Sequence, residues 1–136
     1  LPEAYKLLLM GLTALETHEK PEVAMVWAEV KLLDLTGFLP SFEVCAVGGA
    51  PVKEAEPWLS PDAGGYVSEA EAYAFTDRFR TRAEVLYGLS KVVELDQPPP
   101  NLKFARECLI ALLPFWRKIA SAPLPANEAR IGELRI

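Results

Sequence analysis

The sequence predicts a small, mainly α domain of four to five helices that carries a loop-rich insert. Apolar residues recur every three to four positions in four separate stretches, which is the spacing of one helical face. Between about residues 41 and 76 this spacing is lost, and glycine or proline interrupts the chain every few residues. A length of 136 residues with 51% apolar side chains suffices for one core, so we expect a single domain over residues 1–136.

The first two helices are predicted from their apolar faces and their proline starts. One spans Pro2 to Thr17, with apolar side chains at positions 5, 8, 9, 12 and 15. The next begins at Pro21 and ends at Gly37, which is typical of a C-terminal cap, and Pro40 prevents its continuation. Because only a short polar link separates them, we expect these helices to be antiparallel neighbours.

Two further helices are predicted after the insert. Thr81 and Glu84 have the spacing of a capping box that opens the third helix, which three consecutive prolines at 98–100 follow. Asn101 is the expected cap of the fourth, which runs from residue 102 towards residue 120 and should bend at Pro114. This fourth helix is apolar over much of its circumference, so we expect it to be the central core helix. Residues 127–136 are predicted to form a last short helix.

The insert offers only weak signals of its own. Short extended pieces near residues 42–47 and 66–67 are expected to pair as a small ribbon. Ser68 and Glu71 have the spacing of a capping box, which would open a helical turn over residues 69–74. A loop-rich stretch of this length ordinarily needs a staple.

Two stretches around this insert carry a family resemblance. Residues 28–40 read AEVKLLDLTGFLP and lead into CAVGG at 45–49, and residues 59–71 read LSPDAGGYVSEAE. They resemble the C-terminal region of the RecO family of bacterial recombination-repair mediators, where a similar helix runs into C-x-x-C-G and then F-S-P-x-x-G-G-x-x-C-x-x-C. The order and spacing of these pieces match over roughly residues 1–122. The basic motif that the family shows near residues 123–128 has no counterpart here.

In the family these four cysteines bind zinc, and the matching positions here are Cys45, Gly48, Ser68 and Glu71. Structural zinc needs four donors, usually thiolates or imidazoles, whereas glycine has no side chain and serine is a poor ligand. We therefore expect a degenerate zinc-ribbon-like insert with no zinc cofactor. Cys45 would be a leftover ligand position that acts as a small buried apolar residue, and Cys108 would lie in the core.

The resemblance implies a mediator of DNA repair and recombination. With RecR, such a protein promotes single-strand annealing and RecA loading onto single-stranded DNA covered by single-stranded DNA-binding protein. The N-terminal OB-fold domain that binds DNA in this family has no counterpart before the first helix. We therefore expect this chain to be the scaffold and partner-docking piece of a longer protein. The alternative is a helical adaptor unrelated to repair that uses the insert as its protein interface.

A formal net charge of −5 argues against a surface that neutralises many phosphates. The exception is local, because Arg78, Arg80 and Arg82 alternate along the chain beside aromatic residues at 73, 75 and 79. Such a cluster can bind phosphates, stack on bases or contact an acidic partner peptide. The alternative is a solvated face in which Asp77 and Glu84 pair with these arginines.

Weaker candidate contacts are Arg117 with Lys118 on the fourth helix, and Lys31 on the second. Catalysis is not expected, because the single histidine, His18, lies in a polar turn and the glycine pairs lack a phosphate-binding motif. No apolar run reaches the length that spans a bilayer. With two cysteines in different surroundings, a reducing cytoplasm is the expected compartment.

Overall fold

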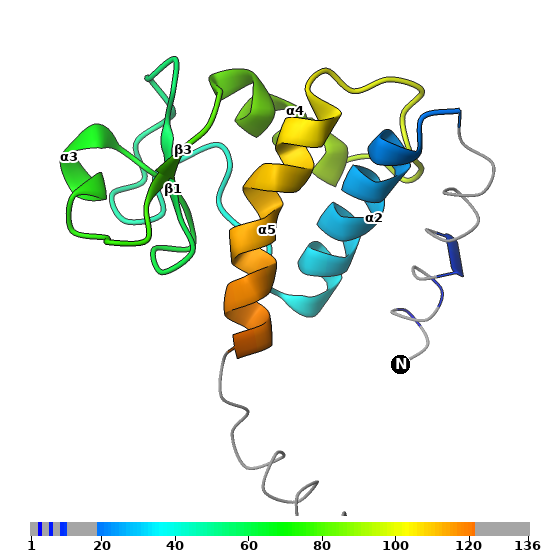
Figure 1. Cartoon of the computed structure of the whole chain (residues 1–136), viewed down its shortest axis with the longest axis horizontal. Coiled ribbons are helices and arrows are strands. Elements are labelled where there is room, and N and C mark those ends of the chain that lie inside the picture. The colour runs from blue at the N-terminus through cyan, green and yellow to red at the C-terminus, as the bar shows by residue number, and fades with distance from the viewer. Residues whose placement is uncertain (1–2, 4–5, 7–8, 11–18, 122–136) are drawn as a thin grey trace, which may run out of the picture.

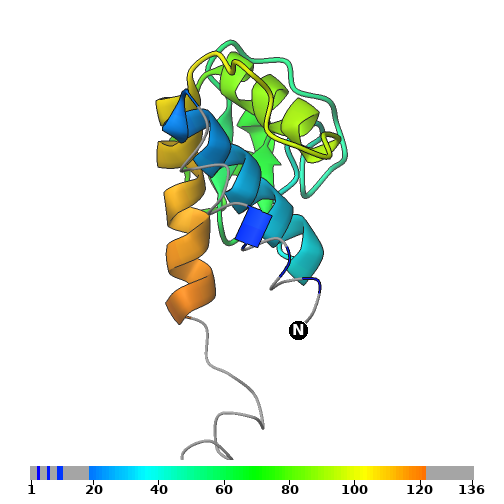
Figure 2. The same ribbon diagram turned by 90° about the vertical axis from the view of Figure 1, so that its right-hand side faces the viewer.

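The structure is a computed structural model that describes residues 3, 6, 9–10 and 19–121. Within these residues the elements are α2 (Pro21–Thr36), β1 (Trp58–Ser60), β2 (Gly65–Val67), α3 (Glu69–Ala72), β3 (Phe79–Arg80), α4 (Ala83–Val93) and α5 (Ala105–Ser121). The three long helices pack against one another, while the sheet and α3 lie to one side of them (Figures 1 and 2). The predicted fold class, a small mainly α domain with a loop-rich insert, is confirmed.

Helix α2 follows its local sequence signals. Proline occupies its first turn, and Gly37 closes it in the left-handed conformation with φ 83°. The Phe38 N–H donates to Leu33 O at 2.9 Å, as in a Schellman cap. One face of the helix is fully buried and consists of Val23, Ala24, Val26, Trp27, Val30 and Leu33. The predicted second helix and its glycine cap are therefore confirmed.

The starts of α4 and α5 differ from the prediction. The N-cap residue of α4 is Arg82, and no side chain makes a capping hydrogen bond to this helix. The predicted capping box that begins at Thr81 is therefore wrong. Helix α5 begins at Ala105 rather than at residue 102, and Phe104 precedes it with a φ of 59°, a conformation that bulky residues rarely adopt. Asn101 does not cap α5, because the helix begins four residues later, and the Asn101 side chain instead accepts a hydrogen bond from Lys20 Nζ.

Helix α5 continues through Pro114 without a break. It contacts both α2 and α4 but buries one face only, made of Cys108, Ala111, Leu112 and Phe115. Helix α2 buries more of its surface than α5 does. The expectation that this last helix is the centre of the core is therefore corrected.

The sheet has the order β2-β1-β3, and both pairs are antiparallel. The predicted ribbon between residues 42–47 and 66–67 forms only in part: the Ala46 N–H donates to Tyr66 O at 2.8 Å, whereas the regular strand partner of β2 is β1, with Tyr66 opposite Leu59. The segment after α2 runs parallel beside the start of β2, where Ser41 and Gly65 form a bridge and the Tyr66 N–H donates to Ser41 O at 2.8 Å. A Cβ atom on Gly65 would lie 2.4 Å from the Ser41 backbone, so only glycine permits the two backbones to approach this closely.

Some predicted segments lie outside the described residues. Of the predicted helix at 2–17, only residues 3, 6, 9 and 10 are described, and these are helical. Its pairing with α2, the turn that contains His18 and the helix expected at 127–136 fall outside the described part of the chain. Among the helices that are described, none has the length and apolar character needed to cross a membrane.

Candidate functional site

The insert brings together most of the positions that match zinc ligands. Cys45 is buried, and its Sγ accepts the backbone N–H groups of Gly48 at 3.5 Å and Ser68 at 3.3 Å. Glu71 lies within α3, one turn beyond Ser68. Over residues 19–121 no three side chains of the metal-binding types gather at one point. Backbone N–H groups thus surround the Cys45 sulfur as they would a metal-bound thiolate, but Cys45 is the only thiol among the four matching positions.

The two cysteines are both free and buried, but their surroundings differ. Burial raises the pKa of the Cys45 thiol, yet the N–H groups of Gly48, Ser68 and Val47 outweigh burial, so the net pKa is lowered. Cys108 has no such donors, and burial raises its pKa to about 12. Cys108 is therefore an inert core residue, as the sequence predicts.

A second polar centre in the insert forms around Glu54. Its carboxylate accepts the Tyr66 hydroxyl at 2.5 Å and the backbone N–H groups of Glu69 at 2.9 Å and Lys53 at 3.2 Å. Burial raises the pKa of Glu54, but these hydrogen bonds outweigh it and lower the net pKa. Burial and the Glu54 carboxylate raise the pKa of Tyr66.

Glu54 therefore satisfies a donor at the start of α3. Ser68 occupies the N-cap position as predicted, but its side chain makes no capping hydrogen bond. The helix ends at Ala72, which is shorter than the predicted turn over residues 69–74. A carboxylate that is distant in sequence thus replaces the local capping box.

Two of the three candidate arginines share one tryptophan. The Arg78 guanidinium carbon lies 4.7 Å from the Tyr73 ring centre and 5.2 Å from that of Trp58, and the Arg80 carbon lies 4.1 Å from Trp58. Tyr73 is 61% exposed. Arg80 also contacts Glu69 at 3.5 Å, while Arg78 Nη1 donates to the backbone at residue 75. Cations and aromatic rings therefore alternate along this surface.

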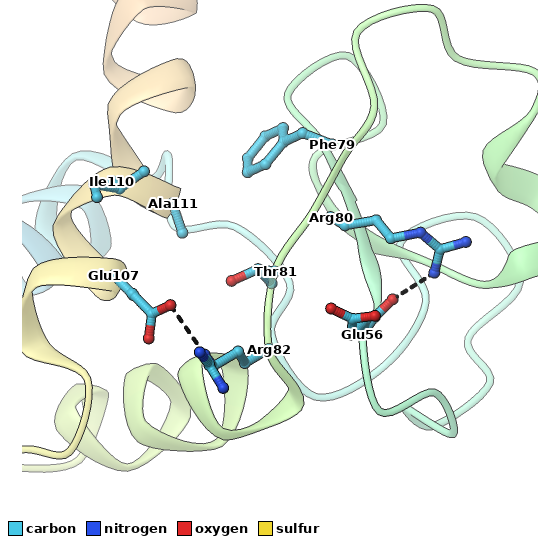
Figure 3. Close-up of a pocket in the computed structure, with 8 residues that line it drawn as sticks. All are labelled: Glu56, Phe79, Arg80, Thr81, Arg82, Glu107, Ile110 and Ala111. Carbon is cyan, nitrogen blue, oxygen red and sulfur yellow. Dashed lines mark hydrogen bonds and ion pairs between the residues drawn. The ribbon is translucent and has the colours of Figure 1, made fainter.

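Arg82 lies apart from that pair. Its Nε donates to Glu107 of α5 at 2.9 Å, and its guanidinium carbon lies 4.7 Å from the Phe104 ring centre. Figure 3 shows Arg80 reaching towards Glu56 and Arg82 towards Glu107, on two sides of the chain that connects them. The expectation that all three arginines share one side is therefore corrected.

A cavity of about 340 Å³ lies between the end of β3 and α5. Arg80 and Arg82 line it, and its apolar wall consists of Phe79, Ile110 and Ala111 (Figure 3). The cavity thus combines cationic groups with an apolar wall, although each arginine already has an acceptor within the protein.

The arginine partners differ from those considered for a solvated face. Glu107 pairs with Arg82, and Glu69 pairs with Arg80. Asp77 instead accepts the Ser60 hydroxyl at 2.5 Å and the Asp62 N–H at 2.7 Å. The interpretation that Asp77 neutralises the arginines is therefore corrected, whereas the charge of Glu84, after that of Glu107, contributes to the raised pKa of Arg82.

The remaining predicted cations have separate positions. Lys118 pairs with Asp62 at 2.5 Å and joins α5 to the turn after β1, while Arg117 is exposed. Lys31 Nζ donates to Val93 O at 2.5 Å, at the C-terminal end of α4. Lys31 therefore acts as a helix cap between α2 and α4, and its predicted contact with DNA or a partner stays a prediction.

Sequence reasoning missed several residues that shape this surface. Trp58 was not among the candidate site residues, yet it contacts two of the candidate arginines. The carboxylates of Glu54, Glu69 and Glu107 carried no local signal, because each meets a group at least eleven residues away in the chain. Phe104 likewise contacts Arg82 only through the packing of α5.

Comparison with known proteins gives one match. A family model described as "Recombination protein O C terminal" matches residues 1–114. The matched range includes α2, the whole insert, α4 and the first part of α5. No curated protein and no solved structure matches the chain.

Proposed function

This chain belongs to the RecO C-terminal family, and we propose that it is the scaffold and partner-docking part of a mediator of DNA recombination and repair. The family implies the role in recombination and repair. We further propose that the mediator acts in the cytoplasm with RecR, promotes single-strand annealing, and helps RecA onto DNA covered by single-stranded DNA-binding protein. DNA would be bound mainly by another domain, and no catalytic activity is proposed for this one.

The charge distribution is the observation that favours docking over DNA binding. The insert at 41–76 has six acidic side chains and one basic one, Lys53; the acidic residues are Glu43, Glu54, Glu56, Asp62, Glu69 and Glu71. Arg80 and Arg82 already pair with carboxylates. A surface of this kind repels the phosphate backbone instead of releasing counterions from it. It is better suited to contacts with protein.

The test is to measure binding of the full chain to RecR from the same organism by isothermal titration calorimetry. A defined complex with a Kd below about 0.1 mM is expected, since weaker binding corresponds to less than about 5.5 kcal/mol. Absence of a complex at protein concentrations of about 0.1 mM would refute the docking role.

Fluorescence anisotropy with labelled single-stranded DNA, at low and moderate salt, tests the competing site at Arg78, Arg80 and Arg82. Little binding is expected for the wild-type chain. Binding that falls with salt and in the triple alanine variant would instead place a DNA site on this domain.

The alternative function, a helical adaptor unrelated to repair, is favoured by apolar side chains on the insert surface. Val44 is 43% exposed and Val47 is 51% exposed. An adaptor of this kind would not bind RecR, and substitution of both valines by serine would weaken its own interaction. The same RecR titration therefore separates the two functions.

A further inference from the structure

The outer side of α5 presents a regular stripe of exposed side chains. Between residues 105 and 117 the exposed positions are Arg106, Ile110, Leu113 and Arg117, spaced by four, three and four residues. Ile110 is 61% exposed and Leu113 is 45% exposed. Alternation of three and four is the heptad spacing with which one helix packs along another. We call these four residues the α5 stripe.

No described element covers the α5 stripe. Helix α5 lies in front of the other helices in Figure 1 and at the edge of the molecule in Figure 2. Half-buried Leu109 and Trp116 lie on the same helix between the stripe and α2, where Trp116 Nε1 donates to Glu29 at 2.7 Å. Ile110 also lines the cavity beside β3 (Figure 3). The stripe thus has an apolar shoulder and a neighbouring hollow that could receive a side chain.

The charge of the α5 stripe indicates what would bind there. Both ends of the stripe are arginines. The one acidic residue between positions 105 and 117 is Glu107; its side chain is 39% exposed, but it lies outside the stripe and pairs with Arg82. Arg106 is 79% exposed and meets Glu22 only at 3.6 Å, so this surface pair contributes little and can exchange partners. An apolar centre between two cationic ends complements apolar side chains between carboxylates.

We propose that the α5 stripe docks an α-helix of a partner protein, one that presents two apolar side chains flanked by Asp or Glu. The inference rests on the docking role proposed above and specifies the surface and chemistry of the partner. Apolar anchors at the centre supply affinity by burial, while the two arginines fix the register by pairing with the flanking carboxylates.

A second copy of this chain is a poorer occupant. Antiparallel pairing of two α5 stripes would oppose Arg106 to Arg117 of the second copy, and parallel pairing would oppose each arginine to itself. Both arrangements bring like charges together. Nucleic acid is also a poorer occupant, because the centre of the stripe is apolar and offers no donor to a phosphate. Single exposed apolar residues are ordinary, but Ile110 and Leu113 are neighbours on one helical stripe.

The test uses a labelled helical peptide with leucines at heptad spacing and flanking glutamates, titrated into the full chain by fluorescence anisotropy. A matched peptide has lysine at each glutamate. The wild-type chain is expected to bind the glutamate peptide at least about tenfold more tightly than the lysine peptide, since two charge pairs change sign. The Ile110→Ser, Leu113→Ser double variant should lose about tenfold in affinity, because its apolar anchors are gone.

Charge reversal provides the decisive variant. Arg106→Glu, Arg117→Glu should invert the preference so that the lysine peptide binds more tightly. Lys91→Glu is the matched control, since Lys91 is exposed and lines a cavity formed by α4 and the insert without residues of α5, and it should leave the preference unchanged. Circular dichroism of each variant verifies that it remains folded.

Equal binding of the two peptides to the wild-type chain, or a preference that charge reversal leaves intact, would overturn the proposal. So would a dimer in sedimentation velocity that the serine double variant abolishes, because that result would assign the α5 stripe to self-association. The assay contains no RecR, so its outcome is independent of the RecR titration. If the chain distinguishes the peptides but does not bind RecR, the docking role of the α5 stripe stands and the proposed function is refuted. If the chain binds RecR but does not distinguish the peptides, only the proposal for the α5 stripe is refuted.

Discussion

Replacement of Glu54 by alanine is expected to destabilise the protein through the hydroxyl of Tyr66. The carboxylate accepts that hydroxyl and two backbone N–H groups, and Tyr66 is fully buried. A hydrogen bond to a charged group contributes about 1.5–3 kcal/mol, and a buried hydroxyl left without a partner costs about 1–3 kcal/mol. Water can replace the carboxylate at the exposed backbone of Lys53 and Glu69 but not at Tyr66. We therefore expect Glu54→Ala to lower the free energy of unfolding by about 3 kcal/mol.

A double-mutant cycle isolates this interaction. Tyr66→Phe removes the hydroxyl and leaves Glu54 with its two backbone donors, so a loss of about 1 kcal/mol is expected. The double variant should lose less than the sum of the single variants by about 1.5 kcal/mol, because no hydroxyl remains to be orphaned. Glu56→Ala is the matched control, since its exposed side chain accepts no hydrogen bond from the described residues.

The pH dependence of the same variant has a definite sign. The pKa of Glu54 is lowered in the folded state, so the ionised carboxylate stabilises the fold at pH values above its ordinary pKa. That contribution is lost as the pH falls through the lowered folded value. The difference between wild type and Glu54→Ala should therefore be full at pH 7 and shrink below about pH 4.5.

Urea unfolding monitored by circular dichroism measures each free energy. A loss smaller than about 0.5 kcal/mol for Glu54→Ala, or no coupling to Tyr66→Phe, would refute the assignment of Glu54 as the polar centre of the insert. An equal loss of stability in Glu56→Ala would show that the effect comes from removal of a negative charge and not from the hydrogen bonds of Glu54.

Three further predictions follow from single contacts. A chelator should leave the melting temperature unchanged, because one thiol cannot close a zinc site; elemental analysis that finds one zinc per chain would contradict this. Lys31→Met should lower the free energy of unfolding by about 1 kcal/mol through loss of the bond to Val93 O, whereas exposed Lys91→Met should not. Burial raises the pKa of Glu29, although the hydrogen bond from Trp116 opposes this, so the stabilising contribution of the neutral carboxyl is present at low pH and lost as pH rises. Glu29→Gln, which is neutral at every pH, should therefore raise the free energy of unfolding at pH 7. The gain should disappear near pH 4, and a gain that persists there would contradict this explanation.

The parts of the fold that could be predicted are those with local causes. Helix α2 shows an apolar face with helical spacing, a proline at its start and a glycine after its end, and all three signals lie within the segment itself. The position of Ser68 before α3 was also predictable, because residue type and spacing mark N-caps. The order of helices and insert followed for the same reason.

The missed features depend on contacts between distant segments. Arg82 pairs with a residue 25 positions away, and Lys31 bonds to a carbonyl 62 positions away. Such pairs are set by how helices pack, which a single sequence does not state. Phe104 illustrates a local failure, since its left-handed backbone ordinarily favours glycine or asparagine, and Asn101 was the more typical cap. The start of α5 could therefore not be placed correctly.

The predicted absence of zinc has a consequence for how the insert folds. Structural zinc contributes about 10–16 kcal/mol in small metal domains, whereas the hydrogen bonds to Cys45 and Glu54 contribute about 1–3 kcal/mol each at most. The insert must therefore gain its stability elsewhere, and Phe42, Tyr66 and Val67 belong to the same buried cluster as the apolar faces of α2, α4 and α5. Because burial joins the two parts, we expect insert and helices to unfold in one transition. Tryptophan fluorescence and helical circular dichroism should then give coincident urea curves, and a separate early transition in fluorescence would show that the insert folds on its own.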